Sequence, residues 1–134
     1  MTEYAYRLDF KVRDYECDLE GIVNNAVYMN YLEHTRHEYF HTIGVDFSEL
    51  AKNGVNLIVI RAEMDYKSSL RSGDSFWVGL RTERESRLKF VFVQDIYRAG
   101  DDRPVMKARI TGTAVNEKGR PFIPDEVERA FGLK

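Results

Sequence analysis

Cysteine is nearly absent from this sequence, in which Cys17 is the only one among 134 residues. A single thiol cannot form an intrachain disulfide, so the disulfide-stapled scaffolds of small secreted proteins are excluded. The N-terminus has no apolar stretch that resembles a signal peptide. On folding, a chain of this length buries roughly 68% of the surface that it exposes when unfolded, so it needs no disulfide or structural metal for stability. We therefore expect one cytoplasmic domain over residues 1–134.

Long hydrophobic runs and an excess of charge are also missing. The longest uninterrupted apolar run covers residues 57–60, far short of the roughly 20 residues that a transmembrane helix needs. The 20 basic and 22 acidic residues leave a net charge of −2. This balance gives the surface as a whole no attraction for nucleic acid or anionic lipid. We expect no membrane span and no nucleic-acid partner, and an anionic ligand needs a local basic cluster.

The sequence does contain a clear periodic pattern, which changes along the chain. Alternating apolar residues predict a strand over residues 4–13. Over residues 27–43 the period becomes helical, with a wide apolar face on which Arg36 also falls. Residues 46–54 begin with the spacing of a capping box and end in glycine, which predicts a second, shorter helix.

The remainder of the chain predicts strands and turns. Four alternating segments, near residues 58–66, 76–80, 88–96 and 105–116, predict strands joined as hairpins, and a tail with a helical turn follows. This order predicts an α+β fold, a five-stranded antiparallel sheet wrapped around one long central helix. Because the edges of an open sheet invite pairing with a second copy, we also expect a homodimer.

The stretch from Asp18 to Tyr28 carries the strongest functional signal. It places a carboxylate just before a glycine turn and the start of the long helix. The N–H groups of a first helical turn are unpaired and partly positive, so they can polarise a carbonyl or hold an oxyanion. Asp18 beside them suits acyl transfer, although an aspartate next to glycine also commonly stabilises a turn. Gly21 allows either a tight turn or a close approach of backbone to ligand.

These residues resemble the signature of a known family. The shared features are a tyrosine, Asp18, Gly21, two β-branched residues, a polar pair, and a helix with Glu33-x-x-Arg36. They are similar to hotdog-fold thioesterases, in the branch of 4-hydroxybenzoyl-CoA thioesterase and the YbgC-like acyl-CoA thioesterases. The match is densest over residues 12–36, and the strand order and the segment 121–126 agree with it. The resemblance implies a hotdog fold with acyl-thioester sites at the interface of a homodimer or a homotetramer.

The resemblance also implies roles for particular residues. Asp18 is expected to activate water or to attack the thioester, while the backbone N–H of Asn25 binds the carbonyl oxygen. Asn24 has two equal interpretations, as a helix N-cap or as an amide that holds water or the thioester. No metal and no cofactor are expected, since coenzyme A or acyl carrier protein enters only as part of the substrate. The Asn24-Asn25 pair replaces Tyr-His of many YbgC-like members and also resembles acyl-ACP thioesterases, which leaves the carrier open.

Further side chains are candidates for contacting the substrate: Tyr28, Glu33, Tyr66, Lys67, Arg87 and Lys89. The family binds the phosphates of coenzyme A with Arg and Lys from a region comparable to that of Arg87 and Lys89, and bidentate guanidinium contacts suit phosphate. The alternative for these two basic residues is a solvated strand face, in which Glu83 and Glu85 are interleaved with basic residues. Core packing is the alternative for Tyr28, and an ion pair with Arg36 is the alternative for Glu33.

Four functions remain as hypotheses. The first is an acyl-CoA thioesterase; the second has the same fold and acts on acyl carrier protein; the third is a non-catalytic acyl-thioester binding protein. A hydratase or dehydratase is disfavoured, because no histidine precedes His34. The three histidines from His34 to His41 lie within an arc of about 60° on the helix, but we expect them to be solvated rather than to bind metal.

Overall fold

The computed structural model describes residues 3–133 of the chain. Strand β1 (Tyr6–Lys11) leads through the short 3-10 helix η1 (Asp14–Glu16) into the long helix α1 (Asn25–Thr42) and the short helix α2 (Phe47–Lys52). Four long strands follow, which are β2 (Asn56–Tyr66), β3 (Ser75–Arg84), β4 (Phe90–Arg98) and β5 (Pro104–Val115). The chain ends with β6 (Pro121–Phe122) and α3 (Asp125–Ala130). The predicted order of elements is therefore confirmed.

The strands form one antiparallel sheet in the order β1-β3-β4-β5-β2. Strands β3, β4 and β5 are joined as hairpins, as the sequence predicts. The predicted hairpin between β2 and β3 is wrong, because β2 pairs with β5 at one edge while β3 pairs with β1 near the other. Alternation shows that a strand has two faces but does not say which neighbour it pairs with. The sheet also gains β6, which is too short to show alternation and pairs with the end of β5.

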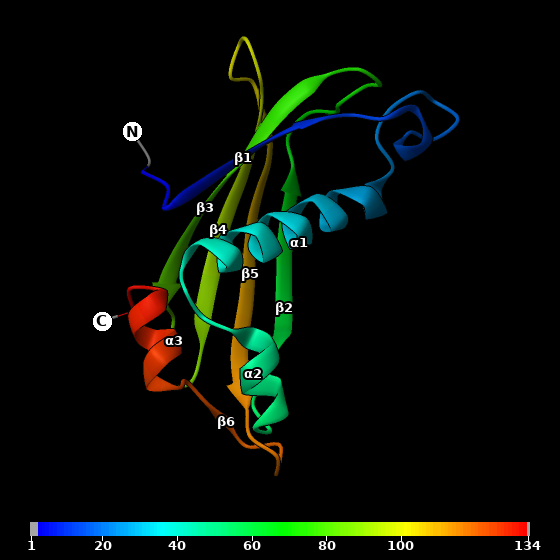
Figure 1. Cartoon of the computed structure of the whole chain (residues 1–134). Helices are drawn as coiled ribbons and strands as arrows, with labels where there is room; N and C mark the ends of the chain where they lie inside the picture. Colours follow the sequence, from blue (N-terminus) through cyan, green and yellow to red (C-terminus); the bar gives the residue numbers. More distant parts are fainter. Residues whose placement is uncertain (1–2, 134) are drawn as a thin grey trace.

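Helix α1 lies across the concave face of this curved sheet (Figure 1), the arrangement expected of a hotdog fold. Its predicted apolar face is buried against the strands, and Tyr31 packs on Phe76 of β3 with ring centroids 4.7 Å apart. Phe76 in turn stacks on Phe10 of β1 at 4.9 Å. Aromatic pairs of this kind add to the stabilisation from burial alone. The core therefore fixes where the N-terminal half of α1 lies over the sheet.

Strand β2 forms a free edge of the sheet and is unusually exposed. Ile58, Val59 and Ile60 are 41%, 47% and 45% exposed, next to a shift in the pairing register with β5 between Val59 and Arg61. An exposed apolar edge strand is a template for pairing with another chain. Among residues 3–133, no helix is both long and apolar enough to cross a membrane.

Candidate active site

The loop that carries Asp18 is a compact turn directly before α1 (Figure 1). Its two ends are joined by a bridge between Cys17 and Val23. Within it, the Asp18 N–H donates to the carbonyl of Ile22 at 2.9 Å, and the Gly21 N–H donates to the carbonyl of Asp18 at 3.0 Å. Gly21 adopts a φ of 79°, which disfavours other residues, and no atom lies within 4 Å of the position of a Cβ. Glycine is thus required by the turn itself.

The carboxylate of Asp18 is exposed and has one oxygen engaged in the turn. Its Oδ1 accepts hydrogen bonds from the N–H groups of Glu20 at 2.9 Å and Ile22 at 3.4 Å. Its Oδ2 accepts no hydrogen bond from residues 3–133. Asp18 therefore stabilises the turn with Oδ1, while Oδ2 remains available to water or substrate.

The first turn of α1 supplies a backbone donor next to this loop. The side chain of Asn24 caps the helix, since its Oδ1 accepts a hydrogen bond from the Ala26 N–H at 2.9 Å. The carbonyl of Asn24 accepts from Val27 N–H, also at 2.9 Å. The N–H of Asn25 has no partner in the part of the chain that the structure describes. Asn24 is thus an N-cap through its Oδ1, the role of its side-chain NH2 towards water or the thioester stays a prediction, and Asn25 keeps a free donor at the helix start.

A buried glutamate that the sequence analysis missed holds the loop against the helix. Glu16 is 7% exposed and accepts hydrogen bonds from the Tyr31 hydroxyl at 2.9 Å, from the Arg13 N–H at 2.8 Å and from the Arg13 guanidinium at 3.1 Å. Its carbonyl accepts from the Asn24 N–H at 3.0 Å. Burial, and secondly the bond to Glu16, raises the pKa of Tyr31. The sequence gives no signal for this role, because Arg13 lacks the side-chain acceptor that a capping box requires at its first position.

Two of the predicted substrate residues lie beside the start of α1. The Tyr66 hydroxyl, at the end of β2, donates to the Asn25 carbonyl at 3.4 Å, and Tyr66 is 48% exposed. Tyr28 packs edge-on against Tyr66 with centroids 5.6 Å apart, but is only 3% exposed and accepts a hydrogen bond from the Leu70 N–H at 3.2 Å. Tyr28 therefore packs in the core, while Tyr66 borders the helix start. Lys67 follows Tyr66 and is exposed.

Arg87 and Lys89 lie at the opposite end of the sheet, in the turn between β3 and β4 near α3 (Figure 1). Arg87 lines a cavity of about 550 Å³ together with Arg84 and Arg129. Arg84 is used within the fold, since it pairs with Glu128 of α3 and donates to the Arg87 carbonyl. Both predicted phosphate contacts are exposed, and within one protomer the structure does not bring them to Asp18.

Glu33 lines a cavity of about 370 Å³ between α1 and strands β2, β4 and β5. Arg36 lines the same cavity, and its guanidinium donates to Gln94 of β4 at 3.0 Å. The intrahelical ion pair with Glu33 that the spacing suggested is not formed within 4.0 Å. Rotation of Arg36 towards the sheet, where Gln94 accepts its hydrogen bond, explains the difference.

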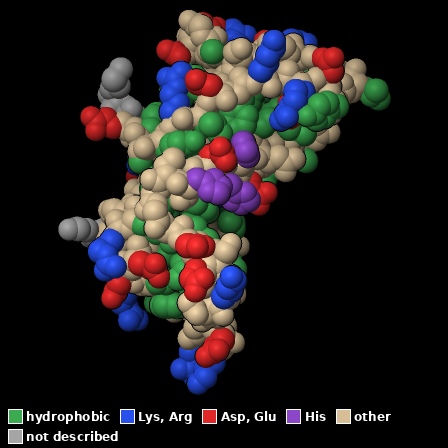
Figure 2. Space-filling view, viewed as in Figure 1, with side chains coloured by type: hydrophobic (Ala, Val, Ile, Leu, Met, Phe, Trp, Pro, Cys, Tyr) green, Lys and Arg blue, Asp and Glu red, His purple; other side chains and the backbone are tan. Residues whose placement is uncertain are grey.

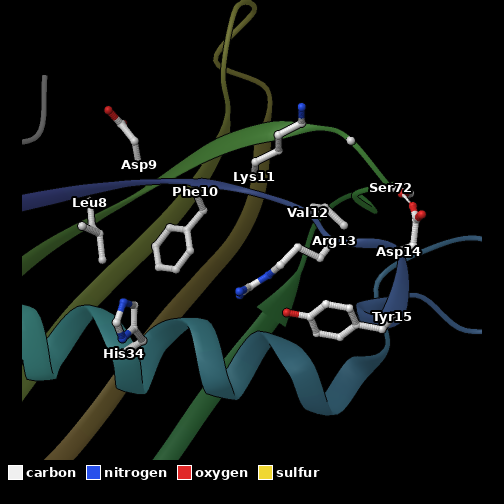
Figure 3. Close-up of a pocket in the computed structure, with 11 residues that line it drawn as sticks. Leu8, Asp9, Phe10, Lys11, Val12, Arg13, Asp14, Tyr15, His34 and Ser72 are labelled. Atoms are coloured by element: carbon white, nitrogen blue, oxygen red, sulfur yellow. Dashed lines mark hydrogen bonds between the residues drawn. The ribbon is translucent and has the colours of Figure 1, made fainter.

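A larger cavity of about 810 Å³ lies between β1 and α1 (Figure 3). Phe10 of β1 and His34 of α1 point into it, and so does Arg13, which precedes η1. The side chains of Asp9 and Lys11 point away. The Arg13 guanidinium is bound to Glu16 and lies 5.4 Å from the centre of the Tyr15 ring. The guanidinium that points into this cavity is therefore already used to hold the loop in place.

The three histidines are exposed on α1 and gather on the face shown in Figure 2. Among residues 3–133, no group of three or more histidine, cysteine, aspartate or glutamate side chains is placed to hold a metal ion. Although His34, His37 and His41 lie on one side of α1, they do not form a metal-binding cluster within the described residues.

Comparison with known proteins identifies the family to which this arrangement belongs. The thioesterase-like superfamily matches residues 12–131. The acyl-acyl carrier protein thioesterase ATL3 of Arabidopsis thaliana is 37% identical over 132 residues, which cover 98% of this chain and 69% of the relative.

Two solved structures share the fold. The 1,4-dihydroxy-2-naphthoyl-CoA thioesterase of Synechocystis has a TM-score of 0.87 at 15% identity, covering 95% of each chain. A protein of unassigned function from Aquifex aeolicus has a TM-score of 0.84 at 30% identity, covering 94% of this chain and 98% of the other. The hotdog fold and the thioesterase resemblance predicted from the sequence are thereby confirmed, and the chain belongs to the thioesterase-like superfamily.

Proposed function

We propose that this protein hydrolyses acyl thioesters at the start of α1. The observation that carries the proposal is the free N–H of Asn25, which lies next to the loop of the exposed Asp18 carboxylate. A thioester carbonyl oxygen that accepts this N–H gains stabilisation as negative charge develops on it during attack. The position at a helix N-terminus strengthens the effect.

Asp18 has one of two roles in this proposal. As general base it takes a proton from water while the water oxygen attacks the carbonyl carbon. As nucleophile it attacks that carbon itself and forms a mixed anhydride, which water then hydrolyses. In both routes the carbon–sulfur bond breaks, the sulfur leaves as a thiol after protonation, and the products are a free acid and a thiol. Neither route uses a metal or cofactor.

The carrier of the acyl group has two candidates. The 37% identical plant relative is named for acyl carrier protein, whereas the naphthoyl-CoA thioesterase with the same fold is named for coenzyme A. For a coenzyme A ester, we propose that the exposed Arg87 and Lys89 bind the phosphates. Since these residues lie far from Asp18 within one protomer, this role requires a second protomer to bring them to the site.

We further propose that the protein is a homodimer joined along β2. This strand is a free edge with apolar side chains exposed on it, and a second copy pairing there would satisfy its open backbone groups. The exposed Leu19 in the Asp18 loop and the half-exposed Tyr66 at the end of β2 are further apolar side chains open to contact with a second copy. The acyl group would enter the cavity of about 370 Å³ that opens beside β2.

Release of free thiol from acyl-CoA and acyl-ACP substrates, with wild type and Asp18→Asn, tests the proposal. Asparagine can accept the same two backbone hydrogen bonds with its Oδ1, so the turn is expected to remain while the charge is lost. We expect the rate to fall by about 100-fold or more. Glu20→Gln, in the same loop, is the matched control and should keep the wild-type rate.

Two results would overturn this function. If wild type releases thiol from none of the substrates, the proposed hydrolase activity is wrong and a non-catalytic binding protein of the same fold remains. If the Asp18→Asn variant keeps full activity, the proposed catalytic role of this carboxylate is wrong. The ratio of acyl-CoA to acyl-ACP rates in the same assay identifies the carrier.

A further inference from the structure

Helix α1 carries a buried cation, Arg36, that the hydrolysis step does not use. The residue is 7% exposed and lies on the face of α1 that packs on the sheet. Its guanidinium donates to Oε1 of Gln94 at 3.0 Å and lies 5.9 Å from the centre of the Phe92 ring. The amide nitrogen of Gln94 donates to the Leu32 carbonyl, also at 3.0 Å. Gln94 is thus held by the helix and in turn holds Arg36.

The guanidinium of Arg36 has far fewer partners than it has donors. It offers five N–H groups, but makes a hydrogen bond only to Gln94 among residues 3–133, and no carboxylate of those residues lies within 4.0 Å of it. Burial lowers the pKa of Arg36, and Glu33, one turn earlier, raises it to a smaller extent. No fully buried side-chain nitrogen of the described chain lacks a partner. The remaining N–H groups therefore face open space rather than packed protein.

That space is the cavity of about 370 Å³ between α1 and the β2 side of the sheet. Apart from Arg36, Glu33 and His37, its walls are apolar or backbone, with Phe40 on one side and Phe90 on the other. A polar donor placed in a mostly apolar cavity is the arrangement that ligand sites use to fix orientation. A fully hydrocarbon occupant would leave the buried cation facing hydrocarbon, which is unfavourable.

We propose that Arg36 is a specificity-determining residue that selects acyl groups bearing an oxygen atom, as a hydroxyl, ketone or carboxylate, in the part that enters this cavity. The inference rests on the thioesterase function proposed above. The oxygen accepts charge-assisted hydrogen bonds from the free N–H groups, whereas an unsubstituted chain of equal length cannot. Sites built to bind a polar group reject the analogue that lacks it much more strongly than apolar pockets discriminate by size.

The test measures kcat/KM for thiol release from decanoyl-CoA and from its ω-hydroxy and ω-carboxy derivatives, or from the acyl-ACP forms if that carrier is preferred. These derivatives carry the oxygen at the far end of the chain, because Arg36 lies about 16 Å along α1 from Asn25. We expect wild type to prefer at least one derivative by about tenfold or more. Arg36→Met should abolish that preference, so that its kcat/KM on each derivative becomes equal to its own kcat/KM on decanoyl-CoA. His41→Ala, on an exposed part of the same helix, is the control and should keep the preference.

If wild type has the same kcat/KM on decanoyl-CoA and on all its derivatives, the inference about Arg36 is wrong, whatever the variants show. The thioesterase proposal would not be affected by that result. The same preference in Arg36→Met as in wild type would also overturn it. If Arg36→Met does not fold, Arg36→Lys replaces it, because a lysine keeps the charge but not the planar set of donors. The preference should then fall, and an unchanged preference would contradict the inference. Only a failure of wild type on every substrate would count against the proposed function.

Discussion

At the scale of single residues, the site loop depends on one buried carboxylate more than on any residue that the sequence pattern singled out. Glu16 collects hydrogen bonds from a tyrosine of α1 and from two groups of Arg13, and its own backbone binds the residue that caps the helix. A buried carboxylate is stable only when such partners surround it. Glu16 thereby ties the loop of Asp18 to the helix that supplies the Asn25 donor.

Replacement of Glu16 by alanine should therefore affect both stability and activity. The Tyr31 hydroxyl and the Arg13 N–H would lose their acceptor, so we expect the free energy of unfolding to fall by about 2–4 kcal/mol. Urea titration followed by circular dichroism measures this loss. Glu16→Gln keeps an acceptor and should lose less. Equal stability of the alanine variant and wild type would show that Glu16 does not anchor the loop.

A second prediction for a single residue concerns Asp101, in the turn between β4 and β5. The hydrogen bond from Arg98, and then the bond from the Arg103 N–H, lowers the pKa of Asp101 from 3.8 to about 2. Because the folded pKa is below the unfolded one, the stabilisation is complete above about pH 4 and is lost as the pH falls towards 2. NMR titration of the carboxyl carbon should show the low pKa in wild type and a return towards 3.8 in Arg98→Met. A pKa near 3.8 in wild type would contradict the pairing.

At the scale of elements, the approach of β2, β4 and β5 beside α1 sets the size of the cavity. Gly112 of β5 lies where a Cβ would be 2.8 Å from the Phe90 ring and 3.0 Å from the Ile58 carbonyl. Contacts this short force the ring or the edge strand to move. The absence of a side chain at this position thus keeps β2 close to β5 and leaves room in the cavity.

Gly112→Ala should consequently destabilise the protein and restrict its substrates. We expect a loss of about 1–3 kcal/mol from overpacking and a shift of kcat/KM towards shorter acyl groups. Phe90→Leu makes room for the added methyl group, so the double variant should recover part of the stability lost by Gly112→Ala, as a double-mutant cycle in urea would measure. Additive losses in that cycle would show that the Phe90 ring is not the obstacle.

At the scale of the whole molecule, the two edges of the sheet differ. Strand β1 alternates half-buried and exposed residues, while β2 is exposed along most of its length. An apolar, exposed edge is a liability unless something covers it. A second protomer on β2 would cover the edge and place two Asp18 loops in one particle.

The oligomeric state can be changed at this edge. Light scattering of wild type should give twice the chain mass of 15.7 kDa, and Ile60→Lys on β2 should give one chain mass, because a buried unpaired lysine disfavours the interface. Asp9→Lys on β1 is the matched control and should remain dimeric. A monomeric wild type would exclude self-association through β2 and a site shared between protomers.

The sequence by itself determined the α+β class, the order of the elements, the buried face of α1 and the family, because periodicity and local turn chemistry are encoded in neighbouring residues. It also located the Asp18 loop and the helix start that follows it. Only the tertiary structure decided that β2 pairs with β5, that Arg36 binds Gln94, and that Glu16 is buried under the loop. Gln94 lies 58 residues after Arg36, and Tyr31 lies 15 after Glu16. Such partners meet only when the sheet curves around the helix, so no local pattern could reveal them.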